Sequence, residues 1–246
     1  MIEKNKMEDF INKVICDDCL VAMKDIPDKS IDMILCDLPY GTTACKWDTI
    51  IPFEPLWEQY KRIIKDNGAI VLTASQPFTS ALVMSNVKMF KYCWTWDKVS
   101  GKGHLVAKIR PLQQTEDVCV FGTGKIKYYP QMIKRPKPVS IKEGSRTEIM
   151  GVKKTSQYRS VRDSWYPKTI LTFSGGNGLN KLHPTQKPVA LFEYLIKTYT
   201  NEGDLVLDNC AGSGTTGVAC KNLNRKYILI EKEPEYIDII NKRLNL

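Results

Sequence analysis

Short apolar stretches rich in β-branched residues alternate along this chain with stretches of helical periodicity. Residues 14–16, 31–36 and 68–73 are three of the apolar stretches, and the first two run directly into aspartates. Stretches of this length predict buried strands, whereas the apolar spacing in 189–199 predicts an amphipathic helix. The alternation predicts an α/β fold, a sheet flanked by helices.

The same reasoning extends the prediction to the rest of the chain. Further strands are predicted at 91–97, 117–121, 204–208 and 226–231. Helices are predicted at 56–67, ending at Asn67-Gly68, at 213–222, and from Pro234 onward.

The composition fits a folded chain of 246 residues, with 43% hydrophobic and 26% charged residues. The charged opening "MIEKNKMEDF" does not resemble a signal peptide, and no apolar run approaches the length that crosses a bilayer. We therefore expect a cytoplasmic protein whose eight cysteines are reduced. Cys16-x-x-Cys19 has no second pair or nearby histidine, so we expect no metal there.

Positive charge is concentrated in one segment. Residues 122–182 contain 13 Lys or Arg and three acids, a net charge of +10, whereas the rest of the chain carries 23 basic and 24 acidic residues. Tyrosines and a tryptophan are interleaved with these charges, which favours nucleic acid as the partner over a merely solvated basic surface. The segment has little periodicity, so we interpret it as an insertion between 1–121 and 183–246.

Two motifs stand at predicted strand ends. In "ILCDLPYG" a buried strand ends in Asp37, Leu38, Pro39 and Tyr40. A carboxylate, a free carbonyl and a ring face could grip a flat, amine-bearing ring, although a plain strand end and turn is the simpler alternative.

The second motif is "VLDNCAGSGTTG", which leads from a strand into a helix, where backbone N–H groups can meet a ligand. Its glycines fit the dinucleotide pattern, and Glu231 ends the next strand. However, only one predicted strand and one further helix follow the glycine-rich turn and its helix, which is too little for a dinucleotide fold. Asp208 would also repel a pyrophosphate. S-adenosylmethionine (SAM), with its ammonium group and single ribose, fits better; a ligand-free tight turn remains the other alternative.

With these motifs placed, the chain resembles the SAM-dependent DNA amino-methyltransferases, which methylate N6 of adenine or N4 of cytosine. Asp37-Leu38-Pro39-Tyr40 resembles the family's Asp-Pro-Pro-Tyr tetrapeptide, and "DNCAGSGTT" from Asp208 resembles its SAM loop. "HPTQKP" at 183–188 matches the segment that precedes this loop. The motif order resembles the β group, which implies a permuted Rossmann-like methyltransferase fold with a mostly parallel sheet and a target-recognition region at 122–182.

The resemblance also implies roles for individual residues. Asp37 and the Leu38 carbonyl would accept the amine N–H groups of a flipped-out base, and Tyr40 would stack on it. Leu38 departs from the usual proline but keeps the carbonyl. The residues implied in SAM binding are Asp18, Asp37, His183, Thr185, Lys187, Asp208, Ala211, Gly212, Ser213, Gly214, Thr215, Thr216 and Glu231.

In the family, aspartate at the head of the tetrapeptide favours adenine N6 over cytosine N4 as the target. Double-stranded DNA is the expected partner, bound through the basic segment 122–182. A restriction-modification role is expected, and a homodimer and a partner restriction nuclease are candidates drawn from the family. Open alternatives are an RNA or protein-glutamine methyltransferase, a dehydrogenase, and a catalytically silent nucleic-acid-binding module. Glu116 and Asp97 are interpreted as surface or turn acids, and His104 as solvated.

Overall fold

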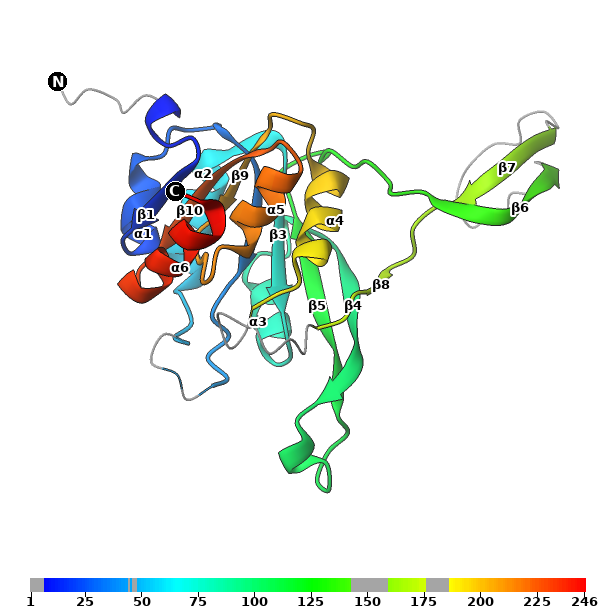
Figure 1. Ribbon diagram of the computed structural model, residues 1–246, viewed down its shortest axis with the longest axis horizontal. Helices are drawn as coiled ribbons and strands as arrows, with labels where there is room; N and C mark the ends of the chain where they lie inside the picture. Colours follow the sequence, from blue (N-terminus) through cyan, green and yellow to red (C-terminus); the bar gives the residue numbers. More distant parts are fainter. Residues whose placement is uncertain (1–6, 44, 46–47, 143–158, 176–185) are drawn as a thin grey trace. The chain divides into compact units, whose positions relative to one another are not determined.

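The computed structural model describes residues 7–43, 45, 48–142, 159–175 and 186–246, with only the backbone at 141–142 and 159–160. It divides into two compact units, Met1–Tyr129 with Thr169–Leu246, and Pro130–Lys168 (Figure 1). The helices of the first unit are α1 (Cys19–Ala22), α2 (Phe53–Ile63), α3 (Phe78–Ser85), α4 (Val189–Tyr199), α5 (Thr215–Asn222) and α6 (Pro234–Leu244), with short 3-10 turns η1 (Met7–Asp9), η2 (Met23–Asp25) and η3 (His104–Val106). Its strands are β1 (Lys13–Cys16), β2 (Ile31–Asp37), β3 (Ile64–Ala74), β4 (Phe90–Lys102), β5 (Gln113–Phe121), β8 (Ile170–Thr172), β9 (Leu205–Asp208) and β10 (Lys226–Glu231).

These strands form one sheet in the order β1-β10-β9-β2-β3-β5-β4-β8. Neighbouring strands are parallel from β1 through to β3, and β4 pairs parallel with β8; β5 runs opposite to both β3 and β4. The C-terminal strands β9 and β10 thus lie between the N-terminal strands β1 and β2. This interleaving confirms the predicted permuted α/β fold with a mostly parallel sheet.

Two hydrophobic cores lie on opposite faces of the sheet. Because side chains alternate along a strand, Ile34 and Cys36 face one core while Met33 and Leu35 face the other, and all four are fully buried. Helices α1 to α3 cover the first face, and α4 to α6 cover the second. Among the described residues, no helix has both the length and the apolar character needed to cross a membrane.

One boundary prediction was wrong. Helix α2 ends at Ile63 and β3 begins at Ile64, so Asn67-Gly68 lies inside a strand and does not end the helix. A Cβ atom at Gly68 would come within 2.9 Å of the Asp32 carbonyl oxygen and 2.7 Å of the Ile64 side chain. The glycine is therefore explained by the close approach of two neighbouring strands.

The second unit is an antiparallel ribbon of β6 (Ile133–Lys142) and β7 (Arg159–Trp165). The guanidinium of Arg135 lies 4.8 Å from the centre of the Trp165 ring, and its Nε donates to the Ser164 carbonyl at 3.1 Å. This unit lies within the predicted segment 122–182, while β8, from the same segment, belongs to the main sheet. The domain division at 122 and 182 stays a prediction.

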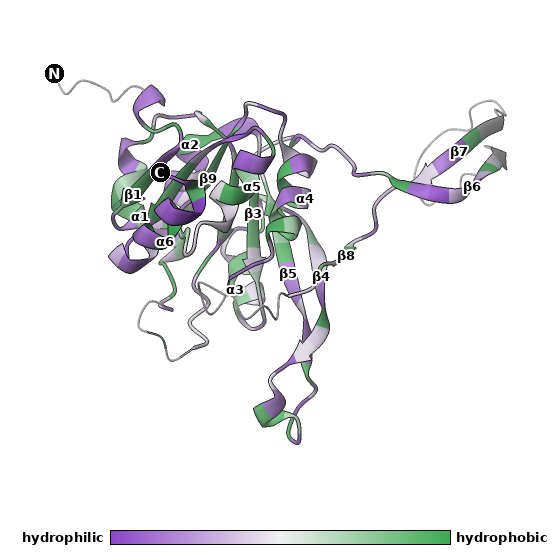
Figure 2. Cartoon of the chain, in the orientation of Figure 1, coloured by the Kyte–Doolittle hydropathy of each residue, from purple (hydrophilic) through white to green (hydrophobic). Residues whose placement is uncertain are grey.

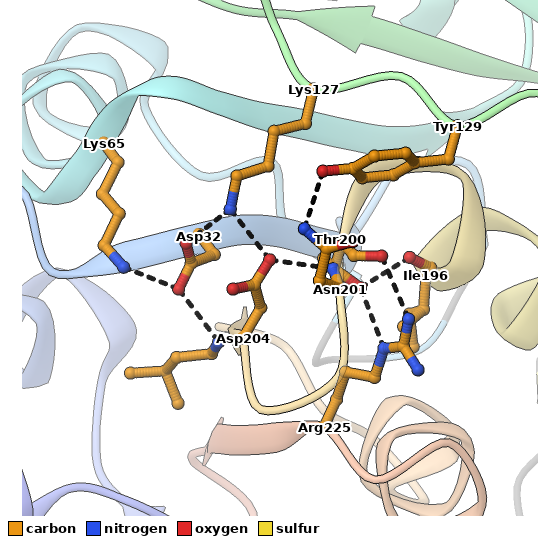
Figure 3. A network of polar contacts seen from close by, with 10 residues as sticks. Asp32, Lys65, Lys127, Tyr129, Ile196, Thr200, Asn201, Asp204 and Arg225 are labelled. Carbon is orange, nitrogen blue, oxygen red and sulfur yellow. Dashed lines mark hydrogen bonds and ion pairs between the residues drawn. The ribbon is translucent and has the colours of Figure 1, made fainter.

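An ion-pair network around the buried Asp32 fixes the chain just before it enters the second unit (Figure 3). Lys127 Nζ lies 3.0 Å from Asp32 Oδ1 and 2.8 Å from Asp204 Oδ2, and Lys65 Nζ lies 2.7 Å from Asp32 Oδ2. Burial alone would raise the pKa of Asp32, but hydrogen bonds from Lys65, the Leu205 N–H and Lys127 outweigh it and hold the pKa below its usual value. Asp32 therefore stays ionised, so the network joins four segments of the chain, those that contain Asp32, Lys65, Lys127 and Asp204.

Candidate active site

Four acids gather at the carboxyl ends of parallel strands. Asp37 ends β2, Asp208 ends β9 and Glu231 ends β10, while Asp18 follows β1 by two residues. The four strands are adjacent in the sheet. Ligands of open α/β sheets bind at this edge, so the topology brings together the two motifs that were noted separately in the sequence.

A cavity of about 490 Å³ lies at this edge, a size that suits a small-molecule cofactor. Most of the residues singled out from the sequence line it: Asp18, Asp37, Leu38, Pro39, Tyr40, Lys187, Asp208, Ala211, Gly212, Ser213, Thr215 and Glu231. Gly214 and Thr216 are not part of the lining, and Thr216 is fully buried beside it. His183 and Thr185 lie outside the described residues.

The carboxylate of Asp37 is held by three donors. Its Oδ1 accepts hydrogen bonds from the Tyr40 hydroxyl at 2.7 Å and from the Thr73 hydroxyl, and its Oδ2 lies 2.8 Å from Lys187 Nζ. The Tyr40 ring stacks on Phe78, with ring centroids 5.1 Å apart. Burial, followed by the charges of Asp37 and Glu116, raises the pKa of Tyr40, so its hydroxyl remains a donor. The strand end therefore presents a fixed carboxylate beside an aromatic ring.

A chain of alternating charges continues from Asp37 across the cavity wall. Lys187 Nζ also lies 3.2 Å from Glu116 Oε2, and Lys98 Nζ lies 3.1 Å from Glu116 Oε1. Burial alone would lower the pKa of Lys187, but the charges of Asp37 and Glu116 outweigh it and raise the pKa. Lys187, which the resemblance assigned to the methionine carboxylate, is thus a buried cation shared by two carboxylates in this structure.

Asp208 is the most deeply buried acid of the cavity, with 3% of its surface exposed. Burial raises its pKa to about 7, although hydrogen bonds from the Thr216 hydroxyl and the Cys210 N–H favour the ionised form. A carboxylate that loses so much hydration is stabilised by a nearby cation. Its position at the head of the glycine loop fits the ammonium group of SAM.

The loop after Asp208 is shaped by its glycines and by Glu231. Gly214 adopts a left-handed φ of +77°, and a Cβ atom there would come within 3.0 Å of Ile240. Glu231 accepts hydrogen bonds from the Gly212 N–H at 2.8 Å and the Glu233 N–H at 3.0 Å. Because each carboxylate oxygen has two lone pairs, Glu231 keeps capacity to accept from a ribose hydroxyl in the cavity.

Asp18 has a structural contact as well as a cavity position. Its carboxylate accepts from the Leu20 N–H at 2.8 Å and so caps the short helix α1. Asp48, which the sequence analysis did not single out, also lines the cavity and also holds a backbone segment in place. It accepts from the N–H groups of Gly41, Thr42 and Thr43 at 2.6–2.9 Å and thereby fixes the loop that follows Tyr40.

Sequence reasoning missed Thr73, Glu116 and Lys98. Thr73 is the last residue of a predicted strand, and in the parallel pair β2–β3 it lies opposite Asp37. A prediction that these two strands pair in parallel would therefore have identified Thr73 as a neighbour of Asp37. Glu116 was interpreted as a surface or turn acid, but it is largely buried between two lysines. It reaches the site because β5 is antiparallel, which puts its beginning at the edge where the parallel strands end.

Comparison with known proteins agrees with this geometry. A family model described as DNA methylase, N6_N4_Mtase, matches residues 31–242. The type II methyltransferase M.HpaI of Haemophilus parainfluenzae is 32% identical over 95% of this chain and 74% of its own length. M.HinfI of Haemophilus influenzae is 28% identical over 98% of this chain and 70% of its own length.

Solved structures show the same likeness. The crystal structure of the M1.HpyAVI–SAM complex superposes with a TM-score of 0.66 at 28% identity, covering 95% of this chain and 99% of that one. The cytosine-N4-specific PvuII methyltransferase, at 18% identity and a TM-score of 0.65, covers 95% of this chain and 92% of its own and shares the fold. The cofactor is SAM, and the chain belongs to the N6/N4 family of SAM-dependent DNA methyltransferases.

Proposed function

We propose that this enzyme methylates the exocyclic N6 amine of adenine in double-stranded DNA. The observation that carries the proposal is the fixed carboxylate of Asp37 in the cavity wall, beside the Tyr40 ring. In the family, aspartate at the head of the tetrapeptide favours adenine, whereas cytosine-N4 enzymes more often have serine there.

An exocyclic amine is a poor nucleophile because its lone pair is delocalised into the ring. Asp37 and the Leu38 carbonyl accept hydrogen bonds from its two N–H groups. These hydrogen bonds draw the nitrogen toward tetrahedral geometry and free its lone pair. Tyr40 stacks on the base, at a stabilisation of about 1–3 kcal/mol. SAM, when bound, supplies the electrophilic methyl group.

Lys187 and Glu116 position Asp37. The Lys187 ammonium lies 2.8 Å from Asp37 Oδ2 and, with the hydroxyls of Tyr40 and Thr73, fixes the orientation of the carboxylate. Glu116 forms a second ion pair with the same ammonium and so stabilises its position beside Asp37. We therefore propose Lys187 as a positioning residue of the reaction; its place near the methionine carboxylate stays a prediction.

For the cofactor, we propose that Asp208 faces the methionine ammonium, Glu231 the ribose hydroxyls and Asp18 the adenine amine. Ala211, Gly212, Ser213, Gly214, Thr215 and Thr216 form the loop around it, and His183 and Thr185 are proposed to lie near the methionine carboxylate. The fit rests on a buried carboxylate with no ion-pair partner among the residues that the structure describes, and on a cavity of suitable size.

We also propose that the basic segment 122–182, with the β6–β7 ribbon inside it, recognises the target sequence. Its net charge of +10 supports contacts with DNA phosphates. The type II names of the relatives support a restriction-modification role with a partner nuclease. An enzyme that methylates the DNA of the cell acts in the cytoplasm, which is the location we propose. A homodimer is proposed from the family alone.

The test is nucleoside mass spectrometry of unmethylated DNA incubated with the purified protein and methyl-labelled SAM. Label in N6-methyladenine is expected from the wild type and none from Asp37→Ala, while calorimetry should show SAM still bound to that variant. Label in N4-methylcytosine would overturn the choice of base. Wild-type turnover in the variant would overturn the role of Asp37.

A further inference from the structure

Strands β4 and β5 continue beyond the sheet as a long hairpin. Their regular pairing runs to Asp97 opposite Thr115, is interrupted, and resumes where Lys102 pairs with Gln113. The hairpin then ends in the 3-10 turn η3 and a short loop, and this end projects away from the sheet (Figure 1). The hairpin belongs to the catalytic unit and lies outside the predicted recognition segment.

The tip exposes large apolar side chains. Leu105 is 102% exposed and Ile109 is 85% exposed, the two highest values among the exposed large hydrophobic side chains of the described residues. Figure 2 shows hydrophobic positions at the end of the hairpin interspersed with hydrophilic ones. Apolar side chains held this far from any core gain nothing in the free protein, which points to a surface that they enter when a partner binds.

The charge of the hairpin identifies that partner. Residues 98–115 contain four Lys or Arg and no acid. Lys98 is paired with Glu116 at the base, whereas Lys108 and Arg110 are exposed beside the apolar tip. A protruding tip that combines cations with apolar side chains is complementary to DNA, which offers phosphates outside and base faces inside.

The hairpin also borders the cavity. Lys98 and the last strand pair before the tip, Lys102 and Gln113, line the same cavity as Asp37 and Tyr40. The tip therefore follows directly in the chain on residues that line the cavity.

We propose that this hairpin is a DNA wedge. Leu105 and Ile109 enter the duplex at the target step and occupy the space of the flipped-out base, while Lys108 and Arg110 contact the adjacent phosphates. Apolar side chains are known to insert between base steps in this way, and extrusion of a base costs unstacking energy that the inserted side chains offset. The inference rests on the proposed function in that the target base leaves the helix.

The test compares Leu105→Ser/Ile109→Ser with a matched variant, Met84→Ser/Val87→Ser, which alters exposed apolar residues on and beside α3. Substrates are a duplex with the mapped methylation site and the same duplex with an abasic site opposite the target base. On the paired duplex, kcat/KM of the tip variant should fall roughly tenfold or more, and on the abasic duplex it should return to within about twofold of wild type. The matched variant should behave as wild type on both.

Equal activity of wild type and tip variant on the paired duplex would overturn the wedge, and so would an equal loss on both duplexes. A tip variant that is monomeric where the wild type is dimeric would assign the tip to a contact between copies instead. If the wild type labels no adenine, the proposed function fails independently of the wedge.

A second measurement tests the phosphate contacts. Lys108→Gln/Arg110→Gln should flatten the slope of log Kd against log salt concentration by about 2, because two counterions fewer are released. An unchanged slope would contradict the proposed placement of the tip on DNA.

Discussion

The buried carboxylate of Asp208 makes the stability of the protein depend on pH in a way that one substitution isolates. Burial raises its pKa from 3.8 to about 7 in the folded protein. When the pKa of a carboxyl group is higher in the folded protein than in the unfolded chain, the group stabilises the fold fully only at pH values below its pKa in the unfolded chain. This contribution is lost as pH rises toward the folded pKa, because the unfolded chain releases its proton first.

The magnitude follows from the shift. Each pKa unit corresponds to about 1.36 kcal/mol, so a shift of about three units costs about 4 kcal/mol in the ionised state. Between pH 5.5 and pH 8 the folded group passes its pKa, and the portion lost in this interval is about 2 kcal/mol. Asp208→Asn removes the titration and keeps the size of the side chain. The free energy of unfolding of the variant, relative to wild type, should therefore rise by about 2 kcal/mol across this interval.

The assay is urea unfolding of both proteins without cofactor, followed by tryptophan fluorescence at half-unit pH steps. All other groups titrate alike in the two proteins, so their contributions cancel in the difference. Asp238→Asn, at an exposed position on α6, is the matched control and should give a flat difference. A flat difference for Asp208→Asn as well would refute the conclusion that burial raises the pKa of Asp208 in the folded protein.

Three further predictions concern the cavity and the core. Lys187→Met should lower kcat with little change in KM for SAM, because Asp37 loses the donor that fixes its Oδ2; Lys187→Arg should restore much of kcat. Glu231→Gln should weaken SAM binding roughly tenfold by calorimetry, whereas Glu235→Gln, on the exposed side of α6, should not. Leu35→Ala, fully buried in β2, should cost about 2–5 kcal/mol of unfolding free energy in a denaturant titration.

The sequence was enough to predict the fold because its motifs stand at strand ends. Asp37 and Asp208 close apolar runs that are too short for helices, and each run became a buried strand. The boundary at Gly68 was wrong because glycine after a helix and glycine at a close strand contact look alike in sequence. Only the paired strands distinguish the two.

The charge chain of the site was not predictable. Lys187, Glu116 and Lys98 come from different segments of the chain, and their meeting depends on β5, which runs opposite to its neighbours β3 and β4 in the main sheet. Periodicity predicts that a strand exists but not its direction. The acidic start of β5 therefore looked like a turn.

The anchoring of the chain on both sides of Pro130–Lys168 has an evolutionary consequence. Lys127 is tied to Asp32 and Asp204 on one side, and β8 pairs with β4 on the other. Residues between these anchors can be exchanged or lengthened without loosening the catalytic sheet. Under the target-recognition role proposed for this segment, a lineage with this architecture would acquire new target sequences by replacing it, while the residues that line the cavity stay unchanged.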